Sequence, residues 1–417
     1  MLRPFDALQY EVSVRTRHPL LPATLATVLV IVIGLNTGLA HAQTVQETIE
    51  FDSLRQALGR AAQLLGSQQS ASTIVALTSI EVATAPLGTS TGGFTFTFDP
   101  LLQVYKRSAS SFGPAFAERA LTAGRTKVSL GGNWVHSSYD SLGGFDLEGN
   151  ELQLAKNVND PGLPRVASTA FNVNLDTQTI AGFVQVGVTD NFDIGAIVPW
   201  VSVSLSADGL FLGPSGSTEG RVTVPHARAW GIGDMGIFGK YLLWRESDGG
   251  LAAAFDVRLP TGDEDELRGL GITRTTASLV WSKGGRISPH ANVGFEFWSK
   301  EVPISASGDV SIRHQFKYAA GLEIDAHPQL TVLVDFVGRQ LLGGGKLAYQ
   351  TFTAPGGTGT VDALVGQAEG ISSVWIVPGA KWNVWRRVLL TASLLTSLAS
   401  DGLRANFTPV AGIDWSF

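Results

Sequence analysis

Apolar and polar residues alternate with a period of two in about twelve segments of the chain after Gly124. In one of them Phe316, Tyr318 and Leu322 fall on one face, and Lys317 and Glu323 fall on the other. This pattern predicts strands that have one face against an apolar medium and the other against a polar one. The segments are 125–137, 178–189, 192–205, 234–245, 250–259, 274–282, 288–298, 310–324, 329–340, 372–384, 387–398 and 405–417.

The connections between these segments alternate in length. A soluble sandwich would also show alternating residues, but it has no reason to keep its long loops at one end. Short turns on one side, long loops on the other and an even strand count are typical of a transmembrane antiparallel up-and-down β-barrel. We therefore predict an all-β barrel of about 12 strands, or 14 if 94–98 and 347–352 also join it. The short connections are 190–191, 246–249, 283–287, 325–328 and 385–386, and the longer ones are 138–177, 206–233, 260–273, 299–309, 341–371 and 399–404.

Aromatic residues mark the end of the chain and several strand ends. The chain stops within a strand at Trp415-Ser416-Phe417, which resembles the signal read by the barrel assembly machinery of the bacterial outer membrane. We therefore expect that machinery, outer-membrane lipid and lipopolysaccharide as partners. Tryptophans near strand ends should lie at the lipid–water boundary. These are Trp134, Trp244, Trp298 and Trp382.

Residues 1–42 have the three parts of a secretory signal peptide. Arginines precede an apolar run from Leu20 to Leu39, and Ala40-His41-Ala42 predicts cleavage after Ala42. The alternative is a transmembrane anchor, because the run is long enough to span a bilayer. Pro22 and Gly34 interrupt the run and favour the signal peptide, so we expect a protein of the cell outer membrane.

Residues 43–92 differ from the rest, and we assign them to an N-terminal helix and a linker that precede a barrel of residues 93–417. Apolar residues at helical spacing predict the helix, and residues 68–92 are rich in Ser, Thr and Gly and predict the linker. The helix is either a small periplasmic element or a plug inside the barrel. Its apolar face contains Phe51, Leu54, Leu58, Ala61, Ala62 and Leu65.

Charge and composition exclude several classes of function. A formal net charge of −6 argues against nucleic acid as a partner, and the absence of cysteine excludes thiolate metal sites and disulfides. Gly231-Ile232-Gly233-Asp234 lacks the spacing of a phosphate-binding loop. The acidic run Asp263-Glu264-Asp265-Glu266 favours a solvated outer loop over a calcium site. We expect no cofactor and no metal.

The residues on the polar face of the predicted strands are those that we expect to line the lumen. Both signs of charge occur in similar number, which argues against strong selectivity for anions or cations. Buried charges need partners, so we expect ion pairs between neighbouring strands, such as Lys240 with Asp256 or Glu323 with Arg339. The network either only supports or fills the barrel, or it takes part in solute passage. The residues are Asp234, Lys240, Asp256, Arg258, His290, Asn292, Glu296, Lys317, Glu323, Asp335, Arg339, Lys381 and Asp414.

A barrel lipid hydrolase is the enzymatic alternative. It would need a serine, a histidine and an orienting polar group close together. His290 is predicted near a short turn, and His136 and Ser137 are neighbours on one strand and should point in opposite directions. A structural role is the better interpretation of both histidines, and we expect no enzyme.

Four strings resemble a family of outer-membrane transporters associated with meta-cleavage pathways of phenol degradation, which is distantly similar to the fatty-acid and hydrocarbon transporters of the outer membrane. They are SFGPAFAERALTAGR (Ser111–Arg125), GVTDNFDIGAIVPWVSV (Gly187–Val203), GIGDMGIFGKYLL (Gly231–Leu243) and RLPTGDEDELRGLG (Arg258–Gly271). The resemblance implies a barrel that admits small hydrophobic or aromatic molecules. The chain departs from the fatty-acid transporters in lacking their Asn-Pro-Ala hatch motif, and those relatives have fourteen strands.

Passive uptake of such molecules is the leading functional hypothesis, with the long loops as the capture site. The apolar and aromatic loop residues expected to make first contact are Phe145, Leu210, Phe211 and Tyr349. The alternative is a structural or interaction barrel with a plugged lumen, and solute flux into liposomes separates the two.

Overall fold

The computed structural model describes nine parts of the chain. They are residues 45–88, 96–99, 104–107, 109, 111–160, 163–212, 218–353, 360–385 and 387–417. The expected signal peptide and its cleavage site after Ala42 lie outside these residues.

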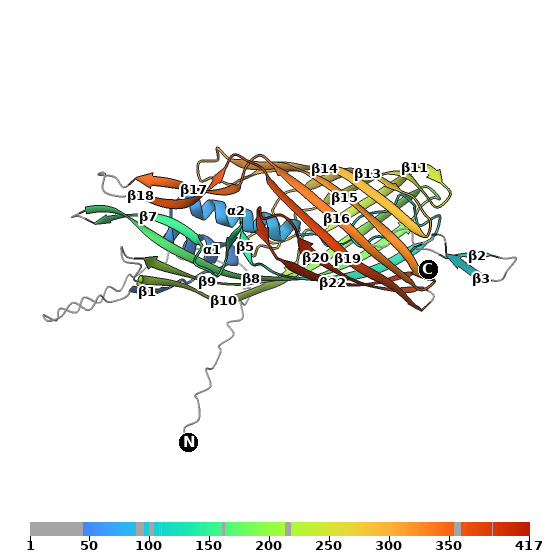
Figure 1. The fold of residues 1–417 in the computed structure, drawn as a ribbon, viewed down its shortest axis with the longest axis horizontal. Coiled ribbons are helices and arrows are strands. Elements are labelled where there is room, and N and C mark those ends of the chain that lie inside the picture. Colours follow the sequence, from blue (N-terminus) through green and yellow to red (C-terminus); the bar gives the residue numbers. More distant parts are fainter. Residues whose placement is uncertain are drawn as a thin grey trace, which may run out of the picture.

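Twelve antiparallel strands of the described chain form a closed barrel (Figure 1). Each of the twelve segments expected from the sequence contributes one strand to the wall, and the last strand pairs with the first. Val128 N donates to Phe417 O at 2.8 Å and Phe417 N donates back to Val128 O at 2.9 Å. In wall order the strands are β4 (Val128–Ser138), β8 (Leu163–Gly187), β9 (Phe192–Leu212), β11 (Gly236–Glu246), β12 (Gly249–Arg258), β13 (Arg274–Ser282), β14 (Ile287–Pro303), β15 (Ser311–His327), β16 (Leu330–Leu342), β19 (Ile371–Trp385), β20 (Val388–Ser397) and β22 (Phe407–Ser416).

The wall has twelve strands and not fourteen, because the two candidate extra segments pair elsewhere. β2 (Phe96–Asp99) pairs with β3 (Val104–Arg107), and β17 (Lys346–Thr353) pairs with β18 (Thr360–Gln367). Both hairpins project from the ends of the barrel, β2–β3 at the end with the short turns and β17–β18 at the end with the long loops (Figure 1).

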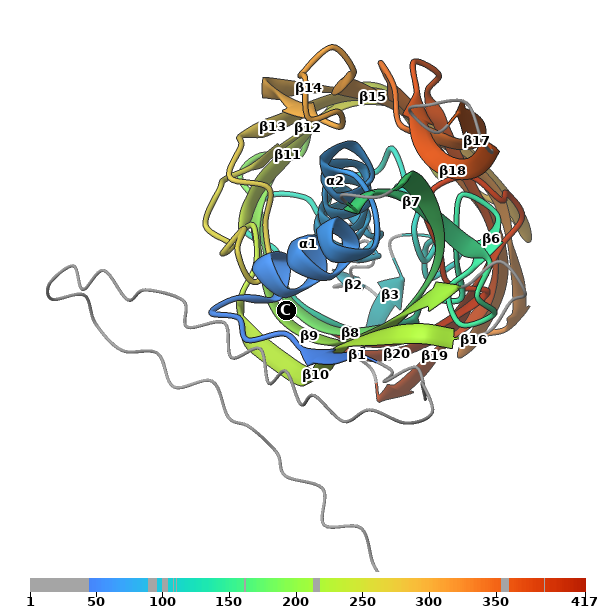
Figure 2. The same cartoon turned by 90° about the vertical axis from the view of Figure 1, so that its left-hand side faces the viewer.

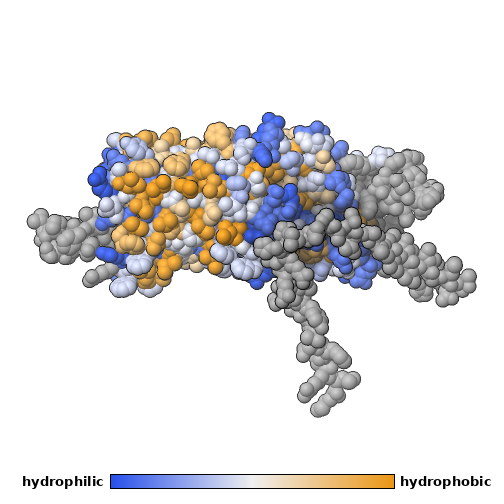
Figure 3. All heavy atoms as spheres, turned by 180° about the vertical axis from the view of Figure 1, so that it is seen from behind, coloured by the Kyte–Doolittle hydropathy of each residue, from blue (hydrophilic) through white to orange (hydrophobic). Residues whose placement is uncertain are grey.

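The outer and inner faces of the wall differ in polarity as the alternation predicts. Large apolar side chains such as Leu279 and Phe336 are exposed on the outside, and Figure 3 shows them gathered in a band over the half of the barrel nearer the short turns. Charged side chains such as Glu296, Glu323 and Asp335 are fully enclosed on the inside. A closed sheet with an apolar outer band and a polar interior is a membrane-spanning barrel.

Three of the four tryptophans expected at the lipid boundary are exposed on the outer face, and one is not. Trp134, Trp244 and Trp382 are exposed, whereas Trp298 is buried. Trp298 is two residues from Glu296 on the same strand, so both side chains lie on the enclosed face, and the indole Nε1 donates to Glu296 at 2.8 Å.

The expected loops 138–177 and 206–233 consist largely of strands. β8 and β9 continue beyond the apolar band, where β7 (Leu152–Asp160) pairs with β8 and β10 (Thr218–Ile232) pairs with β9. This extension is a sheet because its inner face is apolar and covers a core. Smaller elements at this end are β1 (Val45–Thr48), parallel to β10, and β5 (Ser141–Leu142), β6 (Phe145–Asp146) and β21 (Leu403–Arg404).

Two helices in the described residues, α1 (Leu54–Leu65) and α2 (Gln68–Thr84), lie inside the ring of strands at the long-loop end (Figure 2). The face of α1 expected from the sequence is buried, and its Leu58 and Leu65 belong to one core cluster with Val203 and Leu205 of β9. Ser53 caps the helix by accepting from Gln56 N at 3.3 Å.

The expected linker 68–92 was wrong, since α2 occupies most of it. Its hydroxyl residues bond within the helix: Thr73 donates to Gln69 O at 3.0 Å and Ser79 donates to Val75 O at 2.8 Å. Burial on most sides removes the polar stripe that would have shown the helical period. None of the helices in the described residues has the length and apolar character needed to cross a membrane.

The acidic run in the connection between β12 and β13 is mostly exposed, as expected, but it also contacts the start of α1. Leu54 N donates to Glu266 Oε2 at 3.3 Å, Arg55 N donates to Asp265 O at 2.9 Å, and the Arg55 guanidinium lies 3.6 Å from Glu264. Negative charge at a helix N-terminus is stabilising. No cluster of metal-ligating side chains occurs among the described residues.

We predict that a charge on the outer apolar band destabilises the barrel and that the same charge beyond the band does not. Leu279→Arg places the charge in lipid and should lower the free energy of unfolding by about 2–4 kcal/mol. Ser206→Arg, on the outer face of the β9 extension, should cost less than about 1 kcal/mol. Urea unfolding of the protein in lipid vesicles measures both values, and equal costs would contradict this placement of the membrane.

Candidate functional site

Residues 111–123 pass through the lumen near the short-turn end, and we call this segment the lower plug. Carboxylates of the wall hold its backbone. Asp335 Oδ2 accepts from Ala115 N at 3.0 Å and from Phe116 N at 2.9 Å, and Glu323 Oε2 accepts from Gly113 N at 3.0 Å. Hydrogen bonds to ionised acceptors are the stronger kind, so the lower plug is firmly attached.

The lower plug also binds the wall through its own Arg119 side chain and through side chains of other wall strands. Arg119 forms an ion pair with Glu323 at 2.7 Å, and both are buried. Lys240 of β11 donates to Arg119 O at 2.8 Å, and Ala123 N donates to Asp193 Oδ2 at 2.8 Å. Much of the charge on the enclosed face therefore serves the plug.

The two ion pairs expected between neighbouring strands do not form. Glu323 binds Arg119 of the lower plug, and Arg339 binds Glu81 of α2. Lys240 lies 3.7 Å from Glu118, and Asp256 pairs with Arg258 on its own strand at 2.8 Å. The prediction failed because it left the lumen empty, whereas helices and the lower plug bring opposite charges to these wall residues.

Other pairs do join different segments of the wall. His290 Nε2 lies 2.8 Å from Asp335 Oδ1, and Arg274 joins Asp234 at 3.3 Å and Glu296 at 3.7 Å. All thirteen expected lumen residues lie on the enclosed side of the wall. The buried ones are Asp234, Lys240, His290, Glu296, Glu323, Asp335, Arg339, Lys381 and Asp414, and those partly exposed to the interior are Asp256, Arg258, Asn292 and Lys317.

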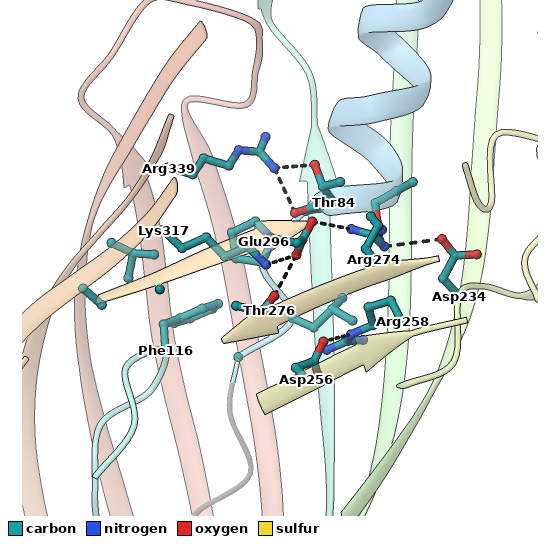
Figure 4. Close-up of a pocket in the computed structure, with 18 of the residues that line it drawn as sticks. Thr84, Phe116, Asp234, Asp256, Arg258, Arg274, Thr276, Glu296, Lys317 and Arg339 are labelled. Atoms are coloured by element: carbon teal, nitrogen blue, oxygen red, sulfur yellow. Dashed lines mark hydrogen bonds and ion pairs between the residues drawn. The ribbon is translucent and has the colours of Figure 1, made fainter. Parts of the chain in front are cut away.

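We call the two helices the upper plug (residues 54–84). A cavity of about 290 Å³, the upper cavity, lies between the lower plug and the upper plug. Figure 4 shows that its charged side chains come from several strands and converge on one space. One part of the lining is apolar and the other is charged. The apolar part includes Val82, Leu87, Phe116, Val337 and Trp375, and the charged part includes Asp234, Asp256, Arg258, Arg274, Glu296, Lys317 and Arg339.

Glu296 is the centre of the charged part of this upper cavity. Its carboxylate is inaccessible and accepts from Thr276 Oγ1 at 3.0 Å, from Gln315 Nε2 at 2.6 Å and from Trp298, while Lys317 forms an ion pair with it. Several donors therefore stabilise one buried anion. The Lys317 side chain is 40% exposed, so it offers a cation to the cavity.

The loop residues expected to capture solute do not converge on this cavity. Phe145 and Tyr349 meet edge to face with ring centroids 4.9 Å apart, and Phe211 packs against the core around the helices. Leu210 alternates with Phe211 and lies on the outer face of β9. None of the four lines the upper cavity, and their part in capture stays a prediction.

His136 and His290, the two histidines considered for a hydrolase site, do not have the contacts that such a site needs. His290 Nε2 lies 2.8 Å from Asp335, and its Nδ1 lies 3.4 Å from Glu323, so each ring nitrogen faces a carboxylate and neither faces a serine. A general base needs one nitrogen for the nucleophile. His136 stacks on Trp134, and Ser137 on the opposite face bonds with Thr408 at 3.2 Å.

Sequence reasoning missed the residues that the two plugs and the segment after α2 contribute to the cavity, namely Val82–Gly88 and Phe116–Glu118. The string Ser111–Arg125 was noticed, but not that it lies in the lumen. The available signal was the pair Glu118-Arg119 inside an apolar stretch without alternation. A buried charge in such a segment indicates a partner inside the fold.

We predict that Asp335→Asn loosens the lower plug. An amide has one acceptor oxygen in place of two, so it cannot accept both from His290 and from the plug N–H groups of Ala115, Phe116 and Ala117. The expected loss in the free energy of unfolding is on the order of 3 kcal/mol. Urea unfolding measures it, with the exposed loop substitution Asp309→Asn as control. An unchanged unfolding midpoint would mean that this carboxylate does not hold the plug.

A sequence model of the family described as "Putative MetA-pathway of phenol degradation" matches residues 155–360. A search of curated proteins gave no significant match.

Three of the solved structures that match this chain all have TM-scores below 0.5. An outer-membrane channel of Pseudomonas putida F1 shares 12% identity, with 72% of this chain and 98% of that chain covered and a TM-score of 0.45. The toluene transporter TbuX of Ralstonia pickettii shares 13% identity, with 72% and 91% covered and a TM-score of 0.30. A homologue of FadL from Pseudomonas aeruginosa shares 14% identity, with 79% and 98% covered and a TM-score of 0.32. The family match itself confirms, over residues 155–360, the resemblance to the phenol-degradation family that the sequence strings indicate.

Proposed function

We propose that the protein is an outer-membrane channel for the passive uptake of small hydrophobic or aromatic molecules. The observation that carries the proposal is the upper cavity, which lies in the lumen between the two plugs. Its volume of about 290 Å³ is at the small end of ligand pockets and suits a molecule of one or two rings. Trp375 and Phe116 supply aromatic surface, and the charged groups supply orientation.

Several features support the outer membrane as the location. The barrel is closed and has twelve strands, and its turns are short at one end and its connections long at the other. Trp415 and Phe417 are exposed on the last strand, where the expected assembly signal lies. In this orientation the short-turn end faces the periplasm, and the upper plug lies toward the cell surface.

The proposed path enters at the long-loop end and passes the upper plug. Thr73 Oγ1 of α2 lies 3.1 Å from Ile304 O, and the helices share a core with the surrounding strands, so a solute passes only if the plug moves or loosens. The family description links the chain to aromatic compounds, which cross lipopolysaccharide slowly and benefit from a protein route.

A barrel without transport is the second candidate. The specific observation in its favour is that Asp335 and Glu323 hold the lower plug. If this attachment is permanent, the lumen stays closed and the barrel serves only as a scaffold. Proteoliposomes that contain the full chain and are challenged with toluene, phenol and a disaccharide separate the two. Uptake of the aromatic compounds above that of empty vesicles supports the channel, and no uptake of any solute supports the scaffold.

We predict that filling the upper cavity blocks uptake. Ala319 of β15 lines the cavity, whereas Ala320 next to it is exposed on the outer face. Ala319→Phe should reduce the rate of aromatic uptake by on the order of tenfold, because its ring occupies the binding space. Ala320→Phe adds the same group to the lipid side and serves as the matched control. If both variants transport like the wild type, the cavity is not on the path.

We also predict that locking α2 to the hairpin β17–β18 slows uptake. The chain has no cysteine, and an ideal Cβ at Gly366 of β18 would lie 3.2 Å from Thr73 Cγ2, close enough for a disulfide between Thr73→Cys and Gly366→Cys. The oxidised double variant should take up aromatic solute several-fold more slowly than its reduced form. Equal rates in both forms would show that uptake needs no movement of α2 against β18.

A further inference from the structure

A second, lower cavity of about 80 Å³ lies on the short-turn side of the upper one. The lower plug, with Gly113, Pro114 and Arg119, and wall residues such as Gln185 and Asp193 line it. The two cavities share five lining residues and therefore meet at one place. The shared residues are Gly88, Ala117, Glu118, Asp256 and Arg258.

This junction contains charges of both signs that remain partly accessible. Asp256 and Arg258 pair at 2.8 Å, with side chains 25% and 21% exposed (Figure 4). The Glu118 side chain is 37% exposed, and its nearest cation is Lys240 at 3.7 Å. The other acids described for the upper cavity, Asp234 and Glu296, are buried and do not line the lower cavity.

The backbone of Glu118 is held in place between the two cavities. With its amide nitrogen toward the plug carbonyl, Asn292 of β14 donates to Glu118 O at 3.2 Å and accepts from Glu118 N at 2.9 Å. Two bonds from one wall side chain fix a plug residue between the cavities. The Glu118 carboxylate is partly exposed and lies 3.7 Å from its cation, so it can interact electrostatically with a molecule that passes the junction.

We propose that Glu118 and Arg258 are the specificity-determining residues of the channel and form the constriction that a solute crosses between the upper and lower cavities. The inference rests on the proposed uptake function. For a net anion the attraction by Arg258 is offset by repulsion from Glu118, and for a net cation the attraction by Glu118 is offset by repulsion from Arg258. A neutral molecule with a dipole is attracted by both, so the pair favours neutral polar aromatic molecules over ions.

The energetic basis is the low effective dielectric constant inside the barrel. Charges a few ångströms from a passing ion interact there several times more strongly than in water. Glu118 and Asp256 balance Arg258 and Lys240 at the junction, so removing the charge of Glu118 should leave a surplus of positive charge, and removing that of Arg258 a surplus of negative charge. If the two residues only held the lower plug, neutralising either would change stability without producing opposite selectivities.

Planar bilayers containing the full-length protein, with a KCl gradient across them, test the proposal. Glu118→Gln should raise the ratio of chloride to potassium permeability by on the order of tenfold, and Arg258→Met should lower it by a similar factor. Glu118→Asp keeps the charge and should keep the wild-type ratio. Glu246→Gln and Lys283→Met change exposed charges at short turns and serve as controls.

The outcomes separate this proposal from the proposed function. Opposite shifts in the two variants, with controls unchanged, support the constriction. A wild-type protein that conducts, together with variants that keep its permeability ratio, overturns the constriction and leaves uptake standing. A wild-type protein that passes neither KCl nor toluene overturns both. Heat-modifiable migration on gels verifies that each variant is folded before its selectivity is read.

Discussion

The hydrogen bonds that join β22 to β4 close the barrel, and the rest of the structure depends on this closure. Lipid offers no partner to a free backbone N–H or C=O, so an open edge within the band of apolar side chains would be costly. Closure leaves the strands with an outer face in lipid and an inner face sealed from it. Apolar and polar side chains therefore alternate along each strand.

A sealed interior creates a second demand, because charged side chains there need partners. Residues upstream of β4 supply many of them. Arg119 binds Glu323, and the backbone of residues 113–117 fills the acceptor positions of Glu323 and Asp335. The plugs therefore fill space and balance charge together, and the cavity is what remains between them. The proposed function and the constriction both depend on this remaining space.

The predictability of each part follows from how local its signal is. The strands of the wall were predictable, because a few consecutive residues suffice to show that apolar and polar side chains alternate. The contact of one face with lipid requires this alternation. The helix α1 showed its apolar face at helical spacing. The helix α2 did not, since it is buried on most sides and its Ser and Thr hydroxyls bond to its own backbone. The pairings of Glu323 and Lys240 were mispredicted because their partners lie more than one hundred residues away in the chain.

The sequence by itself determined the strand positions, their inner and outer faces and the all-β class, since these depend on the chain's local period and on its solvent. Only the tertiary structure decided that residues 54–84 and 111–123 lie within the lumen, which charges meet, and where a cavity remains. Those features depend on which distant segments fill a space of fixed size. That is a property of packing, and no local pattern encodes it.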